Sequence, residues 1–284
     1  MEYFVQIAMN TTVVATLYAI LALGYNILYS AHRFFDMTYA GYCVLGAYSY
    51  FIIMKIGLGI PITIVLALSV VGIVAYLCER YLYAKLQERK ATPVVLMVVS
   101  LGILTIIQGI IAILFTSNIQ VLRSTYTTFH IGGAVFTDVH LATIVCALSL
   151  YLVAWYVFRA TKFGVQLRAV SDNDELAKAS GIPVPTIQRT GTIIASLIGA
   201  IAGILSGMNT SIEPLMGLGL LFKGIIAAII AGLGSMIFGI VGAILLAVSE
   251  NVGVWFISGE WKDAIAFLIL ILILLIRPTG MLRK

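Results

Sequence analysis

Nine hydrophobic segments, most of them about as long as a membrane-crossing helix, account for most of this chain. A helix needs about 20 apolar residues to cross the hydrocarbon core of a bilayer. The chain is 61% hydrophobic and only 10% charged, whereas soluble domains carry about 25% charged residues. The pattern predicts an all-α, polytopic integral membrane bundle of eight to nine spans, forming one domain over 1–284. The segments lie near 4–28, 34–54, 58–78, 94–116, 139–158, 188–210, 217–233, 236–257 and 262–276.

The basic residues predict the orientation of these spans. In an alternating nine-span topology, 13 of the 17 basic residues fall on one side of the membrane. The positive-inside rule places that side in the cytoplasm, so the N-terminus is expected outside and the C-terminus inside. The connection from 117 to 138 is then external. The 13 residues are Arg33, Arg80, Lys85, Arg89, Lys90, Arg159, Lys162, Arg168, Lys178, Arg189, Arg277, Arg283 and Lys284.

The longest polar run, from Thr161 to Thr190, lies between two of these hydrophobic segments. Asn173 is a good helix N-cap, the acidic residues after it suit a first helical turn, and Gly181 followed by a proline is a stop signal. The run therefore predicts a short helix near 174–180, lying on the membrane surface and available to a soluble partner. A solvated loop is the alternative interpretation.

Glycines at regular spacing predict close helix packing. Gly199, Gly203 and Gly207 recur every four residues and so share one face of a helix. The eighth region is also rich in glycine, at Gly232, Gly234, Gly239 and Gly242. The seventh and eighth segments meet at 232–235, which predicts a tight turn or a broken helix.

Polar groups within apolar spans cost several kcal/mol unless they are paired or hydrated, so each is a candidate site. Asp36, beside Thr38 and Tyr39, either lines a substrate route or pairs with Arg33. Asn26 and Gln108 either line the route or bridge helices. Glu250 is expected to hydrogen-bond within the bundle, and Lys223 is expected to extend to the outer interface.

Several functional classes find no support in the sequence. There is no GxxxxGK[ST] motif for a nucleotide, and no Ser-His-Asp or HExxH pattern for hydrolysis. The three histidines are scattered without metal-ligand spacing, and the three cysteines lie in apolar stretches. The chain is therefore predicted to be non-catalytic, with no catalytic residue, no metal site and no nucleic-acid partner.

Four stretches resemble the permease subunits of ABC importers for branched-chain amino acids, a family that also includes urea and short-amide importers. They are GYNILYSAHRFFDMTYAGYCVLGAYSYF, the polar TKFGVQLRAVSDNDELAKASGI, EPLMGLGLLFKGIIAAIIAGLGSMIFGIVGAILLAVSEN, and the C-terminal IRPTGM. The polar stretch is the most specific, because every fixed position of the family's T–x–x–G–x–x–x–R–A–x–x–x–N–x–x–x–A–x–x–x–G–I pattern is present. The chain is more similar to the smaller of the two permease subunits.

The resemblance implies a fold like that of type II ABC importers and a function as one transmembrane permease subunit. The solute would be small and polar, a branched-chain or other amino acid, or else urea or a short amide. The implied partners are a second permease subunit, two ATPase subunits that use ATP and Mg²⁺, a periplasmic or extracellular solute-binding protein, and membrane lipid. The chain itself would hold no cofactor and would lie in the bacterial inner membrane.

The resemblance also assigns roles to residues. Segment 161–187 would be the cytoplasmic coupling segment, with Gly164, Arg168, Asn173, Asp174, Glu175, Ala177 and Gly181 acting in ATPase coupling. Asn26, Asp36, Thr38, Tyr39 and Gln108 would line the substrate pathway, and Gly199, Gly203, Gly207, Gly234, Gly239, Gly242 and Glu250 would pack helices. The chain departs from the family at 36–41, where Asp36 replaces an asparagine and Tyr39 a histidine or glutamine.

An ion-coupled secondary transporter, working as a single polypeptide, is the alternative from another class. Such transporters favour internal inverted repeats and ionisable groups at mid-membrane. The sequence contains no convincing repeat, and its ionisable residues fall mostly near the ends of the predicted spans. A requirement for ATP would separate the two.

Overall fold

The computed structural model describes residues 2–116, 118–122, 127–131, 134–234, 238–256 and 258–276. Helices occupy all nine positions where the sequence predicts a span. They are α1 (Glu2–His32), α2 (Thr38–Met54), α3 (Ile60–Cys78), α5 (Pro93–Phe115), α6 (Asp138–Ala160), α9 (Val184–Asn209), α10 (Met216–Ala231), α11 (Gly239–Phe256) and α12 (Lys262–Ile276). Arg277, Arg283, Lys284, Ser235 and the C-terminal IRPTGM beyond Ile276 lie outside the described residues.

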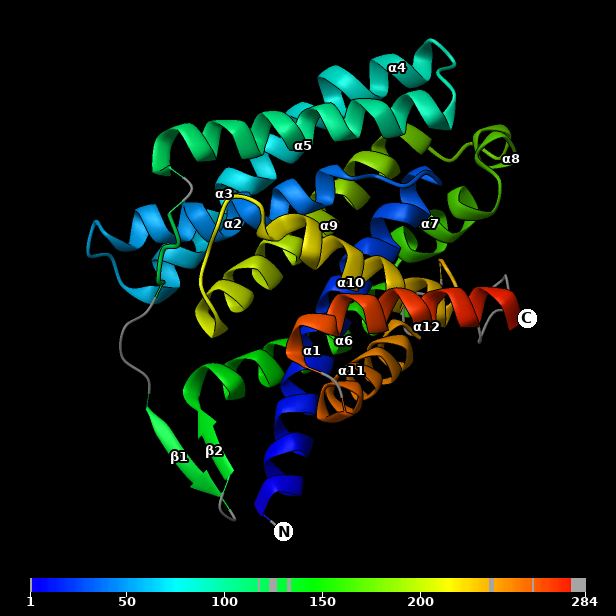
Figure 1. Ribbon diagram of the computed structural model, residues 1–284. Helices are drawn as coiled ribbons and strands as arrows, with labels where there is room; N and C mark the ends of the chain where they lie inside the picture. The colour runs from blue at the N-terminus through cyan, green and yellow to red at the C-terminus, as the bar shows by residue number, and fades with distance from the viewer. Residues whose placement is uncertain are drawn as a thin grey trace. The chain divides into compact units, whose positions relative to one another are not determined.

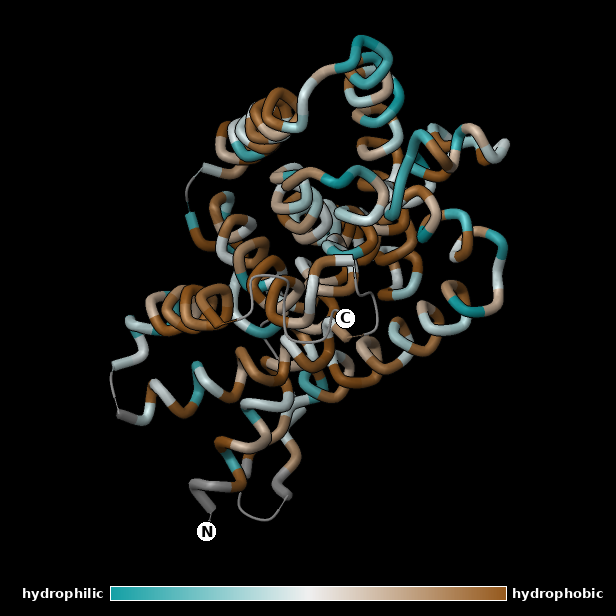
Figure 2. Tube along the Cα trace, turned by 90° about the vertical axis from the view of Figure 1, so that its right-hand side faces the viewer, coloured by the Kyte–Doolittle hydropathy of each residue, from teal (hydrophilic) through white to brown (hydrophobic). Residues whose placement is uncertain are grey.

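Five helical stretches among the described residues are long and apolar enough to cross a membrane. They are Val5–His32, Ile60–Glu88, Pro93–Phe115, Asp138–Ala160 and Val184–Asn209. The α2, α10, α11 and α12 helices are also apolar but shorter. Figure 2 shows hydrophobic residues along most helices and hydrophilic residues gathered in the turns. The chain is therefore an all-α, multi-pass membrane protein.

The chain divides into two compact units, the first comprising Met1–Asn26, Arg123–Ala154 and Phe222–Lys284, and the second Ile27–Leu122 and Trp155–Leu221. Helices α1, α6 and α10 each continue from one unit into the other. The prediction of a single transmembrane domain stays a prediction.

In the second unit α2 packs against α9, α3 and α5 (Figure 1). The contact with α9 is close because both helices present small residues there. A Cβ built on Gly46 of α2 would lie 2.6 Å from the Ala200 Cβ of α9, a separation that real side chains do not tolerate. The buried side of α2 is filled by large rings, and Tyr39, Tyr42, Tyr48 and Tyr50 are each at most 2% exposed.

The α3 helix does not end at Cys78. It continues through a five-residue π-helix, η1 (Glu79–Tyr83), into α4 (Ala84–Glu88). Both Glu79 and Tyr83 point into the protein and are buried. Single π-turns of this kind are rare and are found mostly at functional positions. The π-helix was not predicted from the sequence.

The first unit holds a two-stranded antiparallel hairpin, β1 (Thr128–Ile131) paired with β2 (Ala134–Thr137). It lies in the connection 117–138, which the sequence predicted as an external loop without this pairing. The Gln6 side chain of α1 holds the β2 edge, because its carbonyl oxygen accepts a hydrogen bond from the Val135 amide at 2.8 Å.

The turn predicted between the seventh and eighth segments is confirmed in its described part. The α10 helix ends at Ala231, and Gly232 and Gly234 follow with φ angles of 99° and 86°. Only glycine adopts such angles without strain, so these residues can reverse the chain where the helix stops.

Candidate functional site

The polar run folds into two short helices, α7 (Lys162–Asp172) and α8 (Asp174–Ala179), which meet at Asn173. The Asn173 side-chain oxygen accepts a hydrogen bond from the Leu176 amide at 3.0 Å. Asp174 and Glu175 occupy the first turn of α8, where the helix dipole favours negative charge. The short helix predicted near 174–180 is confirmed (Figure 1).

The α7 helix was not predicted from the sequence. It begins at Thr161, whose hydroxyl accepts a hydrogen bond from the Gly164 amide. Its buried side consists of Gly164, Leu167 and Val170, three residues apart and so on one helix face. A Cβ at Gly164 would lie 2.6 Å from the Phe158 carbonyl oxygen, so the turn from α6 into α7 requires glycine at this position.

The α8 helix presents most of its residues to the surroundings. Asp174, Glu175 and Lys178 are exposed, and only Ala177 is buried, facing α7 and α9. Leu176 is 66% exposed although it is fully apolar. Leu176 is therefore an apolar side chain that the chain itself leaves uncovered between charged neighbours. Leu176 was not singled out in the sequence, where its only signal is an apolar residue within a polar run.

Two further residues predicted to act in coupling lie on either side of α8. Arg168 is exposed on α7 and, within the described part of the chain, forms no ion pair. Gly181 follows α8 with a φ angle of 81° and open space around it. The Gly181 and Ile182 amides bond back to the Lys178 and Ala177 carbonyl oxygens, both at 3.0 Å. This closes the C-terminus of α8 with the left-handed glycine that helix ends favour.

A buried polar cluster lies where α1, η1 and α9 meet. The His32 Nε2 atom is 3.3 Å from the Glu79 carboxylate and 2.7 Å from the Thr192 hydroxyl, and its Nδ1 atom is 3.2 Å from the Gln87 amide nitrogen. His32 and Glu79 are 0% and 2% exposed. Next to His32 in the chain, Arg33 donates a hydrogen bond to the Asp172 carbonyl oxygen at 3.0 Å. Arg33 therefore connects α7 to the end of α1, and the cluster connects α1 to η1, α4 and α9.

Asp36 is 1% exposed in the α1–α2 connection. One carboxylate oxygen accepts hydrogen bonds from the Thr38 amide at 2.8 Å and the Tyr83 hydroxyl at 3.0 Å. The other oxygen has no hydrogen-bond partner among the described residues. The pair with Arg33 considered in the sequence analysis is not formed, because Arg33 is directed to Asp172.

The other predicted pathway residues are only partly brought together. The Thr38 hydroxyl lies 2.6 Å from the Tyr83 hydroxyl, and the Tyr39 ring packs against Gly199 of α9. Gln108 belongs to the same unit, on α5, but Asn26 belongs to the other, where its side-chain oxygen accepts a hydrogen bond from the Gly234 amide at 3.2 Å. Their assignment to a substrate pathway stays a prediction.

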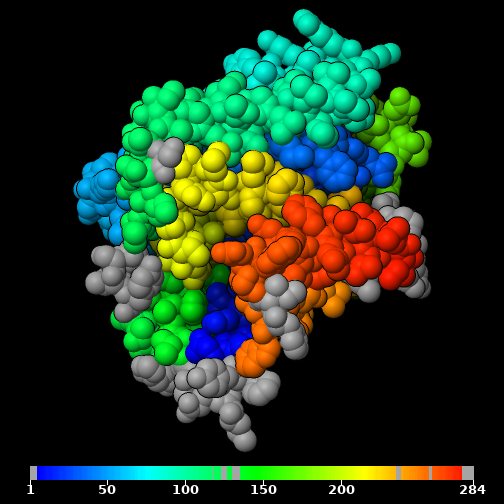
Figure 3. Space-filling model, in the orientation of Figure 1, coloured from blue at the N-terminus to red at the C-terminus, as the bar shows by residue number. Residues whose placement is uncertain are grey.

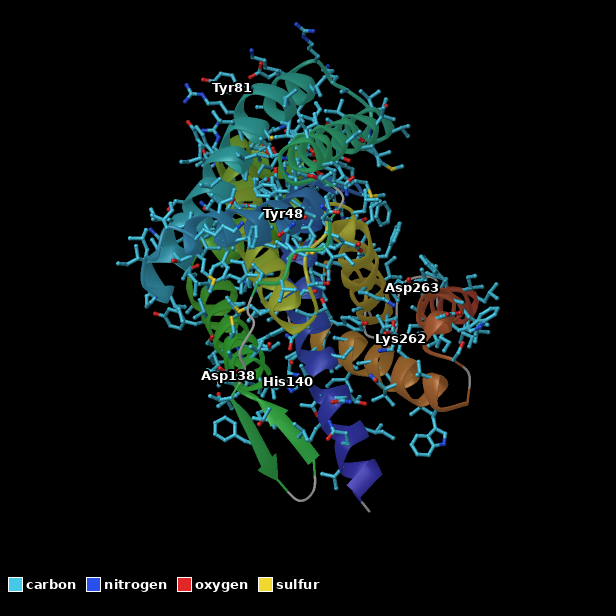
Figure 4. All side chains as sticks on the ribbon, turned by 60° about the vertical axis from the view of Figure 1, so that its left-hand side comes forward. Tyr48, Tyr81, Asp138, His140, Lys262 and Asp263 are labelled. Carbon is cyan, nitrogen blue, oxygen red and sulfur yellow. The ribbon has the colours of Figure 1, made fainter. Side chains whose placement is uncertain are left out.

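Glu250 anchors a charged network inside the first unit. One carboxylate oxygen lies 2.5 Å from the Lys223 ammonium, and the other accepts a hydrogen bond from the Tyr18 hydroxyl at 2.7 Å. Lys223 also lies 2.8 Å from Asp263, which is labelled on α12 in Figure 4. These carboxylates hold the Lys223 side chain, which is 11% exposed, and its extension to the outer interface stays a prediction.

The predicted packing glycines lie at close contacts between helices. On α9, Gly199 and Gly203 face Tyr39 and Cys43 of α2, whereas Gly207 faces Leu122 and Ile212. In the other unit, Gly242 of α11 lies against the Ala227 carbonyl of α10, and Gly239 lies near Asn26 and Tyr151. Small residues let backbones approach closely in membranes, where helix association depends on packing.

An apolar cavity of about 370 Å³ in the first unit is lined by α1, α6 and α11. Three of its hydroxyl groups are directed to the backbone: those of Thr12 and Thr16 donate to carbonyl oxygens of their own helix, and that of Tyr151 donates to the Ala19 carbonyl oxygen. The cavity therefore suits hydrocarbon rather than a polar solute. Within the described ranges, no group of three or more His, Cys, Asp or Glu residues could hold a metal ion.

Residues 7–274 match the family model described as "Branched-chain amino acid transport system / permease component". The match covers nearly the whole chain, so the chain belongs to this family. It is a multi-pass inner-membrane permease component of an ABC importer of the amino-acid type.

Two similar proteins are the high-affinity branched-chain amino acid transport system permease proteins LivH of Escherichia coli (strain K12) and BraD of Pseudomonas aeruginosa. Each is 25% identical over 299 residues, which cover 99% of this chain and 96% of the relative. The structure of PsaBC from Streptococcus pneumoniae in complex with Fab is similar in fold, with a TM-score of 0.53 at 16% identity, over 96% of this chain and 92% of that chain.

Proposed function

We propose that this chain carries branched-chain amino acids across the inner membrane as one permease subunit of an ATP-driven importer. The observation that carries the proposal is α8, a capped, mostly exposed helix at the centre of a segment whose family pattern is complete. A second permease subunit would complete the route, a solute-binding protein would deliver the solute, and two ATPase subunits would use ATP and Mg²⁺. The N-terminus would lie outside and the C-terminus in the cytoplasm.

In this proposal the segment 161–187 transmits the movement of the ATPase. The α8 helix packs on α7 and α9, so a push on α8 acts on helices that are already in contact with it. The α9 helix carries Thr192, which contacts His32 and Glu79. Buried hydrogen-bonded groups are costly to separate, so the cluster would move as one body with α9.

The proposal is tested by reconstituting the permease with its ATPase subunits and binding protein in vesicles. Uptake of labelled leucine, isoleucine and valine should require ATP inside the vesicles, and urea and acetamide should not compete. Uptake driven by an ion gradient without ATP would support the secondary transporter instead. Competition by urea would contradict the choice of solute.

Leu176 is expected to be an anchor for the ATPase. Replacing it with Ala removes an exposed apolar side chain and keeps a residue that favours helix. The affinity of the ATPase for the permease should fall by about tenfold, the loss typical of one interface anchor. Pull-down of the ATPase and ATP-driven uptake measure this.

Leu215 offers a matched control, because it is also 66% exposed and lies in the connection at the other end of α9. Leu215→Ala should leave ATPase binding and uptake unchanged. Equal losses in the two variants, or wild-type binding by Leu176→Ala, would contradict the assignment of α8 as the docking helix.

Asp36→Asn tests whether the buried carboxylate contributes to transport. The remaining side-chain oxygen can still accept from the Thr38 amide and the Tyr83 hydroxyl, so the yield of folded protein should not change. Because the negative charge is lost, uptake should slow severalfold. A large loss of folded protein would assign Asp36 a structural role, and unchanged uptake would remove it from the pathway.

A further inference from the structure

Three cationic side chains in the second unit surround two tyrosine rings where η1 and α4 follow α3. The Arg80 and Arg189 guanidinium carbons lie 5.8 and 5.5 Å from the centre of the Tyr76 ring. Arg80 and Lys85 each lie 5.7 Å from the centre of the Tyr81 ring. These five residues, Tyr76, Arg80, Tyr81, Lys85 and Arg189, form a basic–aromatic cluster in which the rings hold cations at a fixed position.

The positive charge of the basic–aromatic cluster is not neutralised by the chain. Within the described residues, none of its three cations forms an ion pair with a carboxylate. The neighbouring acid, Glu79, is turned inward to His32 and Thr192. The Arg189 Nε atom is buried without a hydrogen-bond partner in the described part of the chain. Arg80 donates one hydrogen bond, to the Tyr76 hydroxyl at 2.6 Å. The cluster therefore has one unsatisfied buried donor, the Arg189 Nε, and an unmatched charge, both of which an anion would satisfy.

The length of the helix places this cluster at a membrane surface. The continuous helical stretch Ile60–Glu88 has 29 residues. At about 1.5 Å per residue it is about 43 Å long, well beyond the hydrocarbon thickness of about 30 Å. Its charged end therefore lies in the headgroup layer, the depth at which tyrosine rings are also favoured. Figure 3 shows the cyan atoms of this end at the surface, and Figure 4 labels Tyr81 among outward-pointing, nitrogen-tipped side chains.

An apolar stripe runs along α3 to the same cluster. Ile62, Leu66, Ile73 and Leu77 are 55%, 41%, 60% and 44% exposed, and their spacing places them on one helix face. Continuing this spacing leads from Leu77 to Arg80 and Tyr81. A hydrocarbon surface that ends at an unmatched positive charge is complementary to a molecule with an acyl chain and an anionic headgroup.

We infer that the basic–aromatic cluster binds the phosphate of an anionic phospholipid, with an acyl chain lying along the exposed stripe of α3. Arg80 and Arg189 donate to the phosphate oxygens, and Lys85 adds positive charge at the rim. The bound lipid joins η1 to α9, because Arg80 comes from η1 and Arg189 from α9. This inference does not depend on which solute the protein carries.

The test uses the full-length chain purified in a neutral detergent and titrated with phosphatidylglycerol or phosphatidylcholine. Native mass spectrometry counts the retained lipid, and thermal unfolding reports the stabilisation. Phosphatidylglycerol should be retained and should raise Tm, and phosphatidylcholine should do neither. Arg80→Gln with Arg189→Gln should weaken phosphatidylglycerol binding by about tenfold or more, because charge-assisted hydrogen bonds are lost.

Arg89→Gln with Lys90→Gln is the matched control, since it removes the same charge from the neighbouring turn and leaves the cluster intact. It should keep most of the binding. An equal loss in the control would mean a diffuse surface charge and would overturn the site. Equal stabilisation by inorganic phosphate alone would overturn the lipid assignment.

A conservative variant keeps the test decisive if the glutamine variants do not fold. Arg80→Lys with Arg189→Lys retains both charges but loses the planar guanidinium groups that lie near the Tyr76 ring and can hold a phosphate through two hydrogen bonds. It should bind phosphatidylglycerol more weakly than the wild type. Undiminished binding would contradict the proposed geometry, as would the absence of retained phosphatidylglycerol when the chain is purified with its partner subunits.

Discussion

Glu250→Ala is expected to lower the free energy of unfolding by about 3–5 kcal/mol, because it leaves the buried Lys223 ammonium without its closest partner. Glu250 is fully buried and Lys223 is 11% exposed, so water cannot readily replace the lost contact. The Tyr18 hydroxyl also loses its acceptor. Thermal and denaturant unfolding in mixed micelles would measure the loss.

The contribution of pairing is separated from that of burial by a second pair of variants. Lys223→Met combined with Glu250→Ala removes both charges and should recover much of the lost stability, since no unpaired ion remains. Asp263→Asn is the control: this second partner of Lys223 is 75% exposed, and its loss should cost less than about 1 kcal/mol. A double variant as unstable as Glu250→Ala alone would show that packing, and not ion pairing, accounts for the effect.

Gly203→Ala is expected to cost about 1–3 kcal/mol or more, because the added methyl group meets backbone. The nearest atoms to a Cβ at Gly203 are the carbonyl oxygen, carbonyl carbon and Cα of Cys43 in α2. Backbone cannot rotate away as a flexible side chain can, so α9 and α2 would have to separate. Since α2 packs against three other helices, the change should also lower the yield of inserted protein.

Gly102→Ala in α5 makes the same chemical change at a helical glycine with no atom within 4 Å of the added Cβ. It should leave the stability unchanged or slightly raised, because alanine favours helix over glycine. Equal stability of the two variants would contradict the close α2–α9 contact.

The spans and the short helix α8 could be predicted because their signals are local. Apolar runs of sufficient length must form helices in a bilayer, since every backbone group has to be satisfied internally. Asn173 and Gly181 mark the ends of α8 through bonds within a few residues of themselves. The turn at Gly232 and Gly234 was predictable for the same reason, because positive φ angles favour glycine at the residue itself.

The features that the sequence did not reveal depend on distant partners. Lys223 and Glu250 are 27 residues apart, and Tyr18 is 232 residues from Glu250. No local pattern reveals that Lys223 is held by such carboxylates. Asp36 shows the same limit, since its partner Tyr83 is 47 residues away and is turned inward by the π-helix.

By itself the sequence determined the class of protein, the positions of nine helices and the location of the short helix α8. Each of these follows from hydrophobicity, capping and spacing within about one helical length of chain. Only the tertiary structure decided which polar groups are paired, that Leu176 is left exposed, and that Arg80 and Arg189 share the Tyr76 ring. Those outcomes depend on which helix faces pack together. In a membrane this packing is set by the steric fit between small residues that are far apart in the chain.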